Sequence, residues 1–273
     1  MKIQKDSLGD RMKGYEDAYR QYLPKRMPTI YRFDGVVWHT LTKSCAKPYD
    51  QKLTNAMNNV AIALCKRIQD AKFAYLQSDE IQILAYNTDF ESKPWFNNNL
   101  NKMLSVSSAR AASVMTKQSK EVFGKEDLEI EFDCRVFPIP IDEVVNVFTW
   151  RQQDATRNAI SMQARAVASH KECNNKNSKQ LQELIFQKAG INFSKLPTEQ
   201  KRGRCVVKKK ETSIVSVRGV ETPIERFKWT VDNEIPIFHE DKTYIEKYLY
   251  GEDYFEKIKA EYEKLRPLFE GPK

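Results

Sequence analysis

The chain has 273 residues, of which 41% are hydrophobic and 30% charged, and its formal net charge is +8. These values predict one large domain, or two closely packed domains, with a substantial core. The chain has no apolar run of about 18 residues and no CxxC pair among its five scattered cysteines, which excludes a transmembrane helix and argues against a zinc site or a disulfide framework.

Cysteine usage and charge indicate the compartment and the class of partner. The first residues lack the apolar block of a signal peptide and unpaired cysteines suit a reducing compartment, so we expect a cytoplasmic protein with no membrane partner. The positive charge favours a polyanionic partner. Much of it gathers in KRGRCVVKKK, Lys201–Lys210, which fits either a phosphate-binding track or a solvated strand edge protected by lysines.

In the first half of the chain the predicted elements alternate between helices and strands. Ser7 and Asp10 form a capping pattern for an amphipathic helix that ends before Pro24. Apolar spacing then predicts, in order, a strand at 29–34, a helix at about 50–70, a tight hairpin of 71–77 and 81–86 around Ser78-Asp79-Glu80, a helix at 99–120 and a strand at 129–139. This order predicts an α+β fold on a split βαβ, ferredoxin-like antiparallel sheet.

A boundary is predicted at Ile139-Pro140, between a first part (1–140) and a mixed C-terminal half (141–273). The second half is expected to hold a long helix or kinked pair at 142–169, a helix at 178–188 stopped by Gly190, strands near 205–209, 214–217 and 225–231, and a helix at 254–265. No low-complexity linker separates the halves, so we expect them to pack together.

Asp34 and Asp79 stand at unusual places in this pattern. Asp34 ends a strand, where β-propensity is poor, and Asp79 lies at the tip of the hairpin. In the predicted sheet the first strand neighbours the hairpin, so both carboxylates emerge at one edge, near the backbone carbonyl of Gly35. Mg²⁺ prefers such oxygen ligands, and two ions about 4 Å apart promote in-line phosphoryl displacement. Spacing alone also fits two ordinary turn acids, and Glu80 is a weaker candidate because a regular hairpin points it to the other face.

Several motifs occur in one order: RFDGVVWH (Arg32–His39), KPYD (Lys47–Asp50), QSDEI (Gln77–Ile81), FDCRV (Phe132–Val136), WRQQDATRN (Trp150–Asn158) and KWTVDNEIPIF (Lys228–Phe238). Together they resemble the tRNA-histidine guanylyltransferase family, in particular its 3′–5′ polymerase-like members. The resemblance implies a palm-like catalytic domain at 1–140, akin to polymerases and nucleotide cyclases. It also implies a tRNA-handling region at 141–273 and assembly as a homotetramer.

The resemblance also assigns chemistry to particular residues. In the family, ATP or GTP activates the 5′-monophosphate of tRNA, and the 3′-hydroxyl of an incoming nucleotide attacks the activated phosphate. The motif match makes Asp34 and Asp79 the catalytic carboxylates that hold two Mg²⁺ ions together with the backbone of Gly35. The matched nucleotide-binding positions are Arg32, His39, Lys47, Asp50 and Ser78. Three of these have a second explanation: a surface lysine for Lys47, core packing beside Trp38 for His39, and a helix cap for Asp50.

A larger set is predicted to bind RNA: Arg151, Asn158, Lys201, Arg202, Arg204, Lys208, Lys209 and Lys210. A guanidinium such as that of Arg151 suits bidentate binding of phosphate, although a charged helix face explains it too. Asp133 and Arg135 equally fit a salt bridge at a strand edge.

Three departures from the family pattern bear on specificity. Val36 stands where eukaryotic members often carry Arg, Thr156-Arg157-Asn158 replaces their His-Ile-Asn segment, and Asn97–Asn99 replace basic residues after Trp95-Phe96. The sequence therefore favours template-directed 3′–5′ repair of truncated tRNA 5′ ends over its alternative, addition of G at position −1 of histidine tRNA. A nucleotide cyclase and a non-catalytic RNA-binding protein are further alternatives, opposed by the tRNA-family motifs beyond Pro140 and by the intact acid pair.

Overall fold

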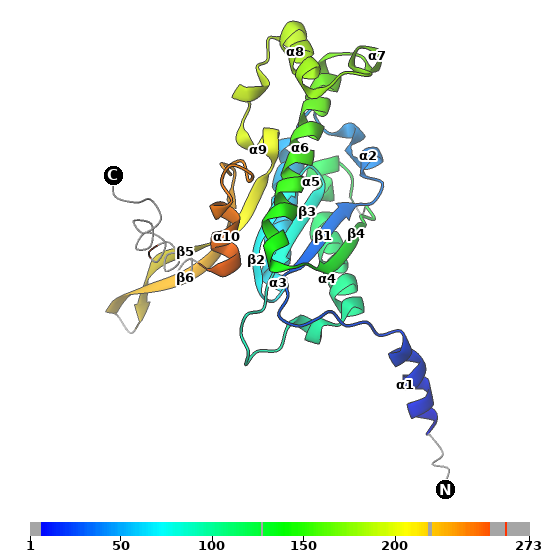
Figure 1. Ribbon diagram of the computed structural model, residues 1–273, viewed down its shortest axis with the longest axis vertical. Helices are drawn as coiled ribbons and strands as arrows, with labels where there is room; N and C mark the ends of the chain where they lie inside the picture. Colours follow the sequence, from blue (N-terminus) through cyan, green and yellow to red (C-terminus); the bar gives the residue numbers. More distant parts are fainter. Residues whose placement is uncertain (1–6, 127, 218–219, 252–259, 261–273) are drawn as a thin grey trace, which may run out of the picture.

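The structure is a computed structural model that describes residues 7–126, 128–217, 220–251 and 260 (Figure 1). Its strands are β1 (Thr29–Gly35), β2 (Ala71–Gln77), β3 (Glu80–Ala85), β4 (Phe132–Pro138), β5 (Arg204–Val217) and β6 (Val220–Asp232). Its helices are α1 (Leu8–Ala18), α2 (Trp38–Leu41), α3 (Gln51–Arg67), α4 (Leu100–Thr116), α5 (Ser119–Phe123), α6 (Val144–Val167), α7 (His170–Cys173), α8 (Ser178–Ala189), α9 (Thr198–Arg202) and α10 (Thr243–Tyr250). The helix predicted at 254–265 lies outside the described residues. Within those ranges no helix is long and apolar enough to cross a membrane.

The strands form one antiparallel sheet in the order β4-β1-β3-β2-β5-β6. The first four of these strands have the arrangement of a split βαβ sheet, with β1 between β3 and β4, so the predicted fold class is confirmed. Phe33 pairs with Ile81 of β3, and Asp34 pairs with Asp133 of β4. The end of β1 therefore lies beside the turn between β2 and β3.

Helices cover both faces of the sheet (Figure 1). Because side chains alternate along a strand, Tyr31 and Phe33 enter the core that α3, α4 and α5 complete. Ile30 of the same strand and Phe73 of β2 enter a second core, which α6, α10 and the 233–242 loop complete. Both faces of β1 are thus buried over most of its length, which fixes the register of β1 and the position of Asp34 at its end.

The second half of the chain extends the same sheet. The predicted long helix forms as one helix, α6, of 24 residues. The strands predicted separately at 205–209 and 214–217 are one strand, β5, because the exposed residues between them continue to pair with β6, as Lys210 does with Phe227. β5 also pairs with β2, so the sheet crosses the boundary at 140, and the division into two domains stays a prediction. The helix predicted at 99–120 is interrupted at Lys117–Gln118, between α4 and α5.

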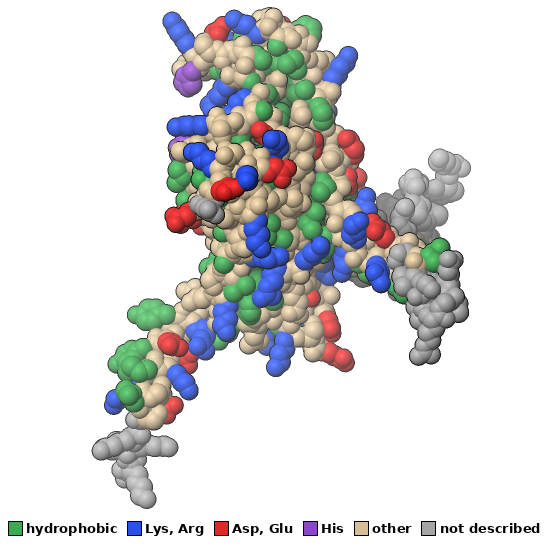
Figure 2. Space-filling view, turned by 180° about the vertical axis from the view of Figure 1, so that it is seen from behind, with side chains coloured by type: hydrophobic (Ala, Val, Ile, Leu, Met, Phe, Trp, Pro, Cys, Tyr) green, Lys and Arg blue, Asp and Glu red, His purple; other side chains and the backbone are tan. Residues whose placement is uncertain are grey.

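Helix α1 forms as predicted but projects from the body of the molecule (Figure 1). Its cap is made by Ser7, whose hydroxyl oxygen accepts a hydrogen bond from the Asp10 N–H at 3.1 Å. Its apolar face is not covered: Leu8, Tyr15 and Tyr19 are 67%, 70% and 81% exposed, and Figure 2 shows hydrophobic side chains along this arm.

A buried ion pair joins α6 to the hairpin. Glu80, at the first position of β3, is only 5% exposed. Arg151 of α6 binds it with both ends of its guanidinium, Nε at 2.9 Å from Oε1 and Nη2 at 2.5 Å from Oε2. Arg32 of β1 lies 3.1 Å from the same carboxylate, and the Gln82 amide donates to it at 2.6 Å. One carboxylate therefore ties together β1, β3 and α6.

This geometry corrects the RNA-binding prediction for Arg151. The side chain is buried and its donors are taken by Glu80 and, at 3.2 Å, by Asp154. Removing the guanidinium from Glu80 to bind RNA would leave a buried carboxylate with Arg32 as its remaining cation.

We predict that Arg151→Met lowers the free energy of unfolding by about 3–5 kcal/mol, because it leaves the Glu80 charge buried and poorly compensated. The matched control is Arg157→Met on the same helix, where Arg157 makes an exposed pair with Asp154 at 3.1 Å and the expected loss is below about 1 kcal/mol. Urea unfolding followed by circular dichroism measures both. Equal losses of unfolding free energy in the two variants would show that the buried Glu80–Arg151 pair stabilises the fold no more than the exposed Arg157–Asp154 pair.

Candidate active site

Asp34 and Asp79 lie at one edge of the sheet, as predicted. Asp34 occupies the end of β1, and Asp79 lies in the two-residue turn between Gln77 and Glu80, which pair with each other. Burial raises the pKa of Asp79 above its ordinary value, and the charge of Asp34 raises it further. The two carboxylates are therefore close enough to repel each other.

Further charges surround Asp34. Burial raises the pKa of its carboxyl group, and Glu80 and Asp133 add to the rise, while Arg32 and Arg135 oppose it. Arg135 binds Asp133 at 3.2 Å, which confirms the predicted salt bridge. Burial, with Glu80 and Asp133 nearby, thus disfavours the ionised form of Asp34 in spite of the two arginines.

Gly35 has a packing reason to be glycine. A Cβ at this position would lie 2.1 Å from Cδ1 of Trp38, far inside van der Waals contact. The Trp38 indole is buried between Phe123 and Phe132. The chain therefore turns sharply after β1, with the Trp38 indole against the Gly35 backbone. This packing requires glycine whether or not the Gly35 carbonyl binds a metal.

The acid pair fits the predicted Mg²⁺. Two crowded carboxylates with raised pKa values are stabilised by a divalent cation, and carboxylate oxygens are its preferred protein ligands. In the part of the chain that the structure describes, no group of three or more His, Cys, Asp or Glu side chains is arranged to hold a metal. An ion on Asp34 and Asp79 would therefore take its other ligands from the backbone, water or nucleotide phosphates.

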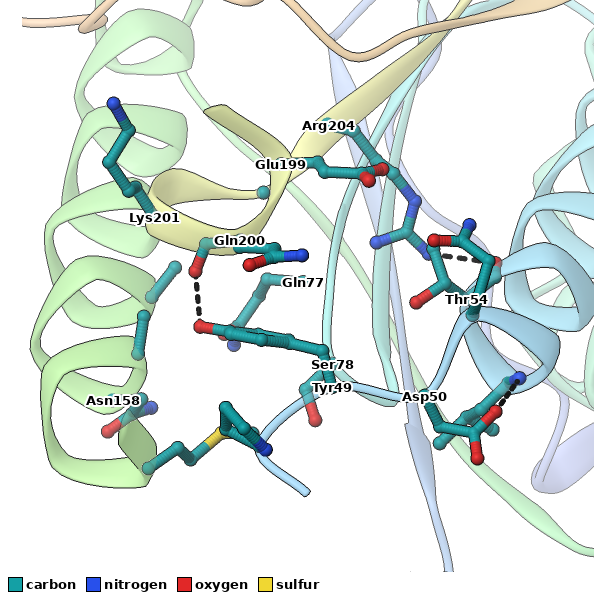
Figure 3. A pocket seen from close by; sticks show the side chains of 17 residues that line it. Tyr49, Asp50, Thr54, Gln77, Ser78, Asn158, Glu199, Gln200, Lys201 and Arg204 are labelled. Atoms are coloured by element: carbon teal, nitrogen blue, oxygen red, sulfur yellow. Dashed lines mark hydrogen bonds between the residues drawn. The ribbon is translucent and has the colours of Figure 1, made fainter. Parts of the chain in front are cut away.

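A pocket opens next to the hairpin turn, between the start of α3, α6 and α9 (Figure 3). The Tyr49 hydroxyl donates a hydrogen bond to the Gln200 carbonyl and so bridges the loop before α3 to α9. Asn158 faces the pocket from α6. The pocket brings together several residues predicted from separate motifs: Asp50, Ser78, Asn158, Lys201 and Arg204.

Asp50 caps α3, which confirms that explanation of its role. Its Oδ1 accepts the N–H groups of Lys52 at 2.9 Å and Leu53 at 3.1 Å, and its Oδ2 accepts that of Ala46 at 2.9 Å. Burial alone would raise the pKa of Asp50, but these backbone donors outweigh it and lower the pKa. Asp50 thus holds the loop that carries Tyr49 into the pocket.

Arg204 lies in the pocket wall and not on an RNA-facing surface, which corrects its prediction. It is 4% exposed and donates to the Thr54 carbonyl at 3.1 Å and to the Asn58 side chain. Burial lowers its pKa to about 10. Its role is to hold the start of β5 against α3.

Of the other predicted nucleotide-binding residues, His39, Lys47 and Ser78 are exposed and Arg32 is partly buried. His39 is exposed while Trp38 is buried, so the core explanation for His39 is wrong. Lys47 is exposed and its ammonium donates to the Thr42 carbonyl at 2.9 Å. Ser78 is exposed beside Asp79 with a φ of 48°, and Arg32 is paired with Glu80. Nucleotide binding by these residues stays a prediction.

The lysines of β5 lie along the projecting hairpin of β5 and β6 (Figure 1). Lys208, Lys209 and Lys210 are exposed. Lys210 pairs with Glu225 at 2.7 Å, and the Lys208 ammonium lies 5.0 Å from the Phe227 ring centroid. Lys and Arg side chains also gather over the middle of the body (Figure 2), as expected for a protein with a polyanionic partner.

Sequence reasoning missed Tyr49 and Gln200 in the pocket wall and gave Arg204 a different role. Tyr49 and Gln200 meet although 151 positions separate them, and Arg204 reaches Thr54 across 150. Local patterns carry no signal for such pairs. Gly203 lies in the same wall, and its positive φ and tight approach to the Leu76 carbonyl require glycine.

Comparison with known proteins gives consistent matches. Residues 9–140 match the family described as Thg1, tRNAHis guanylyltransferase. A solved bacterial tRNA(His) guanylyltransferase (Thg1)-like protein in complex with ATP is 42% identical, covers 89% of this chain and 99% of its own, and superimposes with a TM-score of 0.80. A bacterial Thg1-like protein in complex with GTP is also 42% identical, covers 90% of this chain and all of its own, and has a TM-score of 0.74.

More distant relatives agree with these. The tRNA(His) guanylyltransferase 1 of Arabidopsis thaliana is 28% identical over 237 residues, which are 82% of this chain but 41% of the plant protein. The chain therefore spans less than half of this relative and nearly all of the bacterial proteins.

We predict opposite effects of Asp79→Asn without and with Mg²⁺. In EDTA at pH 7 the variant melts at a higher temperature than the unsubstituted protein, because the raised pKa of Asp79 means that its ionised form destabilises the folded state. This advantage shrinks as the pH falls through the native pKa and Asp79 becomes protonated. Added Mg²⁺ raises the melting temperature of the unsubstituted protein and leaves that of the variant unchanged.

The control for this measurement is Asp133→Asn, which removes an exposed acid at the same end of the sheet. It should keep the response to Mg²⁺. If Asp79→Asn responded to Mg²⁺ as well as the control does, the acid pair would not be the metal site.

Proposed function

Because the chain belongs to the tRNAHis guanylyltransferase family, we propose that it is a nucleotidyltransferase that adds nucleotides to the 5′ end of tRNA. The observation that carries the proposal is the meeting of Asp34 and Asp79 beside a pocket lined by Ser78 and Asn158. The bacterial relatives bound to ATP and GTP support nucleoside triphosphates as its substrates.

The acid pair would hold Mg²⁺ at the mouth of this pocket. Mg²⁺ in such a site neutralises phosphate charge and lowers the pKa of an attacking hydroxyl. Asp34 and Asp79 bring the negative charge that attracts the ion, and the buried Glu80–Arg151 pair keeps the turn that carries Asp79 in place. We propose that two Mg²⁺ ions bind there.

Cationic residues would neutralise the polyanionic substrates. Lys47 is exposed in the loop before α3, and Lys201 lines the pocket from α9. The exposed Lys208, Lys209 and Lys210 would contact tRNA phosphates further from the reaction, since the hairpin that carries them extends from the sheet. Binding of this kind weakens as salt concentration rises.

Two forms of the reaction are distinguished by the RNA substrate. The family description and the named relatives favour addition of G to histidine tRNA. The second candidate is template-directed 3′–5′ repair of truncated tRNA. It is favoured by the higher identity to the Thg1-like proteins, 42% against 28%, and by the departures at Val36 and Thr156–Asn158. In a templated reaction base pairing selects the nucleotide.

We further propose that the protein works in the cytoplasm as a homotetramer. Its cysteines are all free thiols, as suits a reducing compartment. The exposed apolar face of α1 is a surface that assembly would cover. Light scattering coupled to size exclusion, with and without residues 1–20, would measure the oligomeric state.

We predict that the protein extends tRNA at its 5′ end and that Asp79→Ala abolishes extension. Intact histidine tRNA and a tRNA lacking its first nucleotide, each with a 5′-monophosphate or a 5′-triphosphate, are incubated with Mg²⁺ and single nucleotides. Extension of the truncated tRNA by the nucleotide complementary to the acceptor strand supports templated repair. Addition of G to histidine tRNA alone supports the guanylyltransferase reaction.

Asp133→Ala is the matched control, because Asp133 is an exposed acid paired with Asp34 across the strands and should not be required. Extension of 5′-triphosphate ends alone would indicate that the activation step is absent. Release of a cyclic nucleotide from ATP or GTP would support the cyclase alternative. Binding of tRNA without extension of any end would overturn the proposed activity.

A further inference from the structure

A groove runs along the other side of α9 from the pocket. It lies between α6, α8, α9 and the loop at 237–239, and we call it the α6–α9 groove. Its polar lining includes Gln153 and Arg157 of α6, Gln182 of α8, Lys201 and Arg202 of α9, and His239.

The charges of the α6–α9 groove differ from those of the pocket. The pocket is lined by two acids, Asp50 and Glu199, whereas no carboxylate lines the groove. The surrounding segment, 169–204, carries eight Lys and Arg against three Glu, or +5 of the net +8 of the whole chain. The groove is therefore suited to a ligand with several negative charges.

Some hydrogen-bond donors that line the groove are already paired, and others have no partner among the described residues and are available to such a ligand. Lys201 donates to the Ser194 carbonyl at 2.7 Å and Arg157 is paired with Asp154. Arg202 differs, because its guanidinium has no hydrogen-bond or ion-pair partner among the described residues although the side chain is partly buried. The side-chain amides of Gln153 and Gln182 likewise have no partner in this part of the chain. A partly buried guanidinium in a groove that two amides also line suits a phosphate group.

The groove and the pocket are neighbours. Lys201 lines both, and the residues of α6 in the pocket, such as Asn158, alternate with those in the groove, such as Thr156 and Arg157. A strand whose reacting 5′ end enters the pocket needs a path for the phosphates that follow. The groove supplies cations along such a path, with Lys201 at the junction.

We propose that the α6–α9 groove binds the phosphate backbone of the RNA strand next to the reacting end, with Arg202 as its principal phosphate ligand. The inference rests on the proposed function and names a specific contact surface for the RNA. A phosphate could also come from a second nucleotide. The cations favour the strand, since several of them, Arg157 of α6 and Lys201 and Arg202 of α9, line the groove.

The test is Arg202→Gln, with Arg165→Gln as the matched control. Arg165 is an exposed arginine of α6 that lines none of the described pockets. Binding of tRNA is measured by filter retention without nucleotide, at several salt concentrations, and binding of GTP is measured separately. Arg202→Gln should weaken tRNA binding about tenfold, as for loss of one charge-assisted hydrogen bond, and reduce the salt slope by about one. GTP binding and the melting temperature should not change.

A second variant guards against compensation by neighbouring residues. Gln153→Glu places a negative charge in the groove from an exposed position and should weaken tRNA binding at least as much, again without an effect on GTP. Unchanged tRNA binding in both variants would overturn the inference while leaving the proposed function intact. A loss confined to GTP binding would mean that the groove is a nucleotide site. Failure of the unsubstituted protein to bind tRNA would instead count against the proposed function.

Discussion

The position of the candidate active site depends on the buried carboxylate of Glu80. It follows Asp79 directly in the chain and binds Arg151 of α6 and Arg32 of β1. Buried ion pairs contribute little net stability compared with apolar packing, because desolvation offsets most of the attraction. The pair instead constrains orientation: with Arg151 bound to Glu80, α6 lies with Asn158 against the pocket. The same contact therefore orients the turn that carries Asp79 and the helix that faces the pocket.

The site itself is electrostatically unfavourable without a bound cation. Burial raises the pKa of both carboxyl groups, the charge of Asp34 raises that of Asp79 further, and Glu80 and Asp133 raise that of Asp34. The fold holds them together because β1 is central and packed on both faces, so its end cannot move away. Glycine at position 35 and the indole of Trp38 behind it give the chain a rigid exit from the strand. Stability provided by the core thus maintains an arrangement of carboxylates that protonation or a bound cation would relieve.

The sequence predicted elements well where local pattern determines them. Apolar alternation and turn residues identified the split βαβ order, Ser7 and Asp50 as caps, and the convergence of Asp34 with Asp79. It failed where tertiary contacts assign the role. Arg151 and Arg204 look like surface cations for RNA, but each is buried against a partner distant in the chain, Glu80 and Thr54. The sequence predicted two short strands where the structure has β5, because the residues in the middle of β5 are polar. Pairing with β6, and not an apolar face, holds this part of the strand in place.

The pocket and the groove differ in charge. This difference would let neighbouring sites bind nucleoside triphosphates and the RNA strand. Carboxylates near a triphosphate repel it unless a cation lies between them, so the acids at the end of β1 are useful only where Mg²⁺ binds. Phosphates further along the RNA have no such cation and require direct contact with Lys or Arg. Asp34 and Asp79 lie beside the pocket, which is lined by two further acids, Asp50 and Glu199, whereas no carboxylate lines the groove and Lys201 lines both. In the proposed reaction this separation would keep the acids of the proposed metal site apart from the cations that contact the RNA backbone. Helix α9, only five residues long, is the boundary between the two.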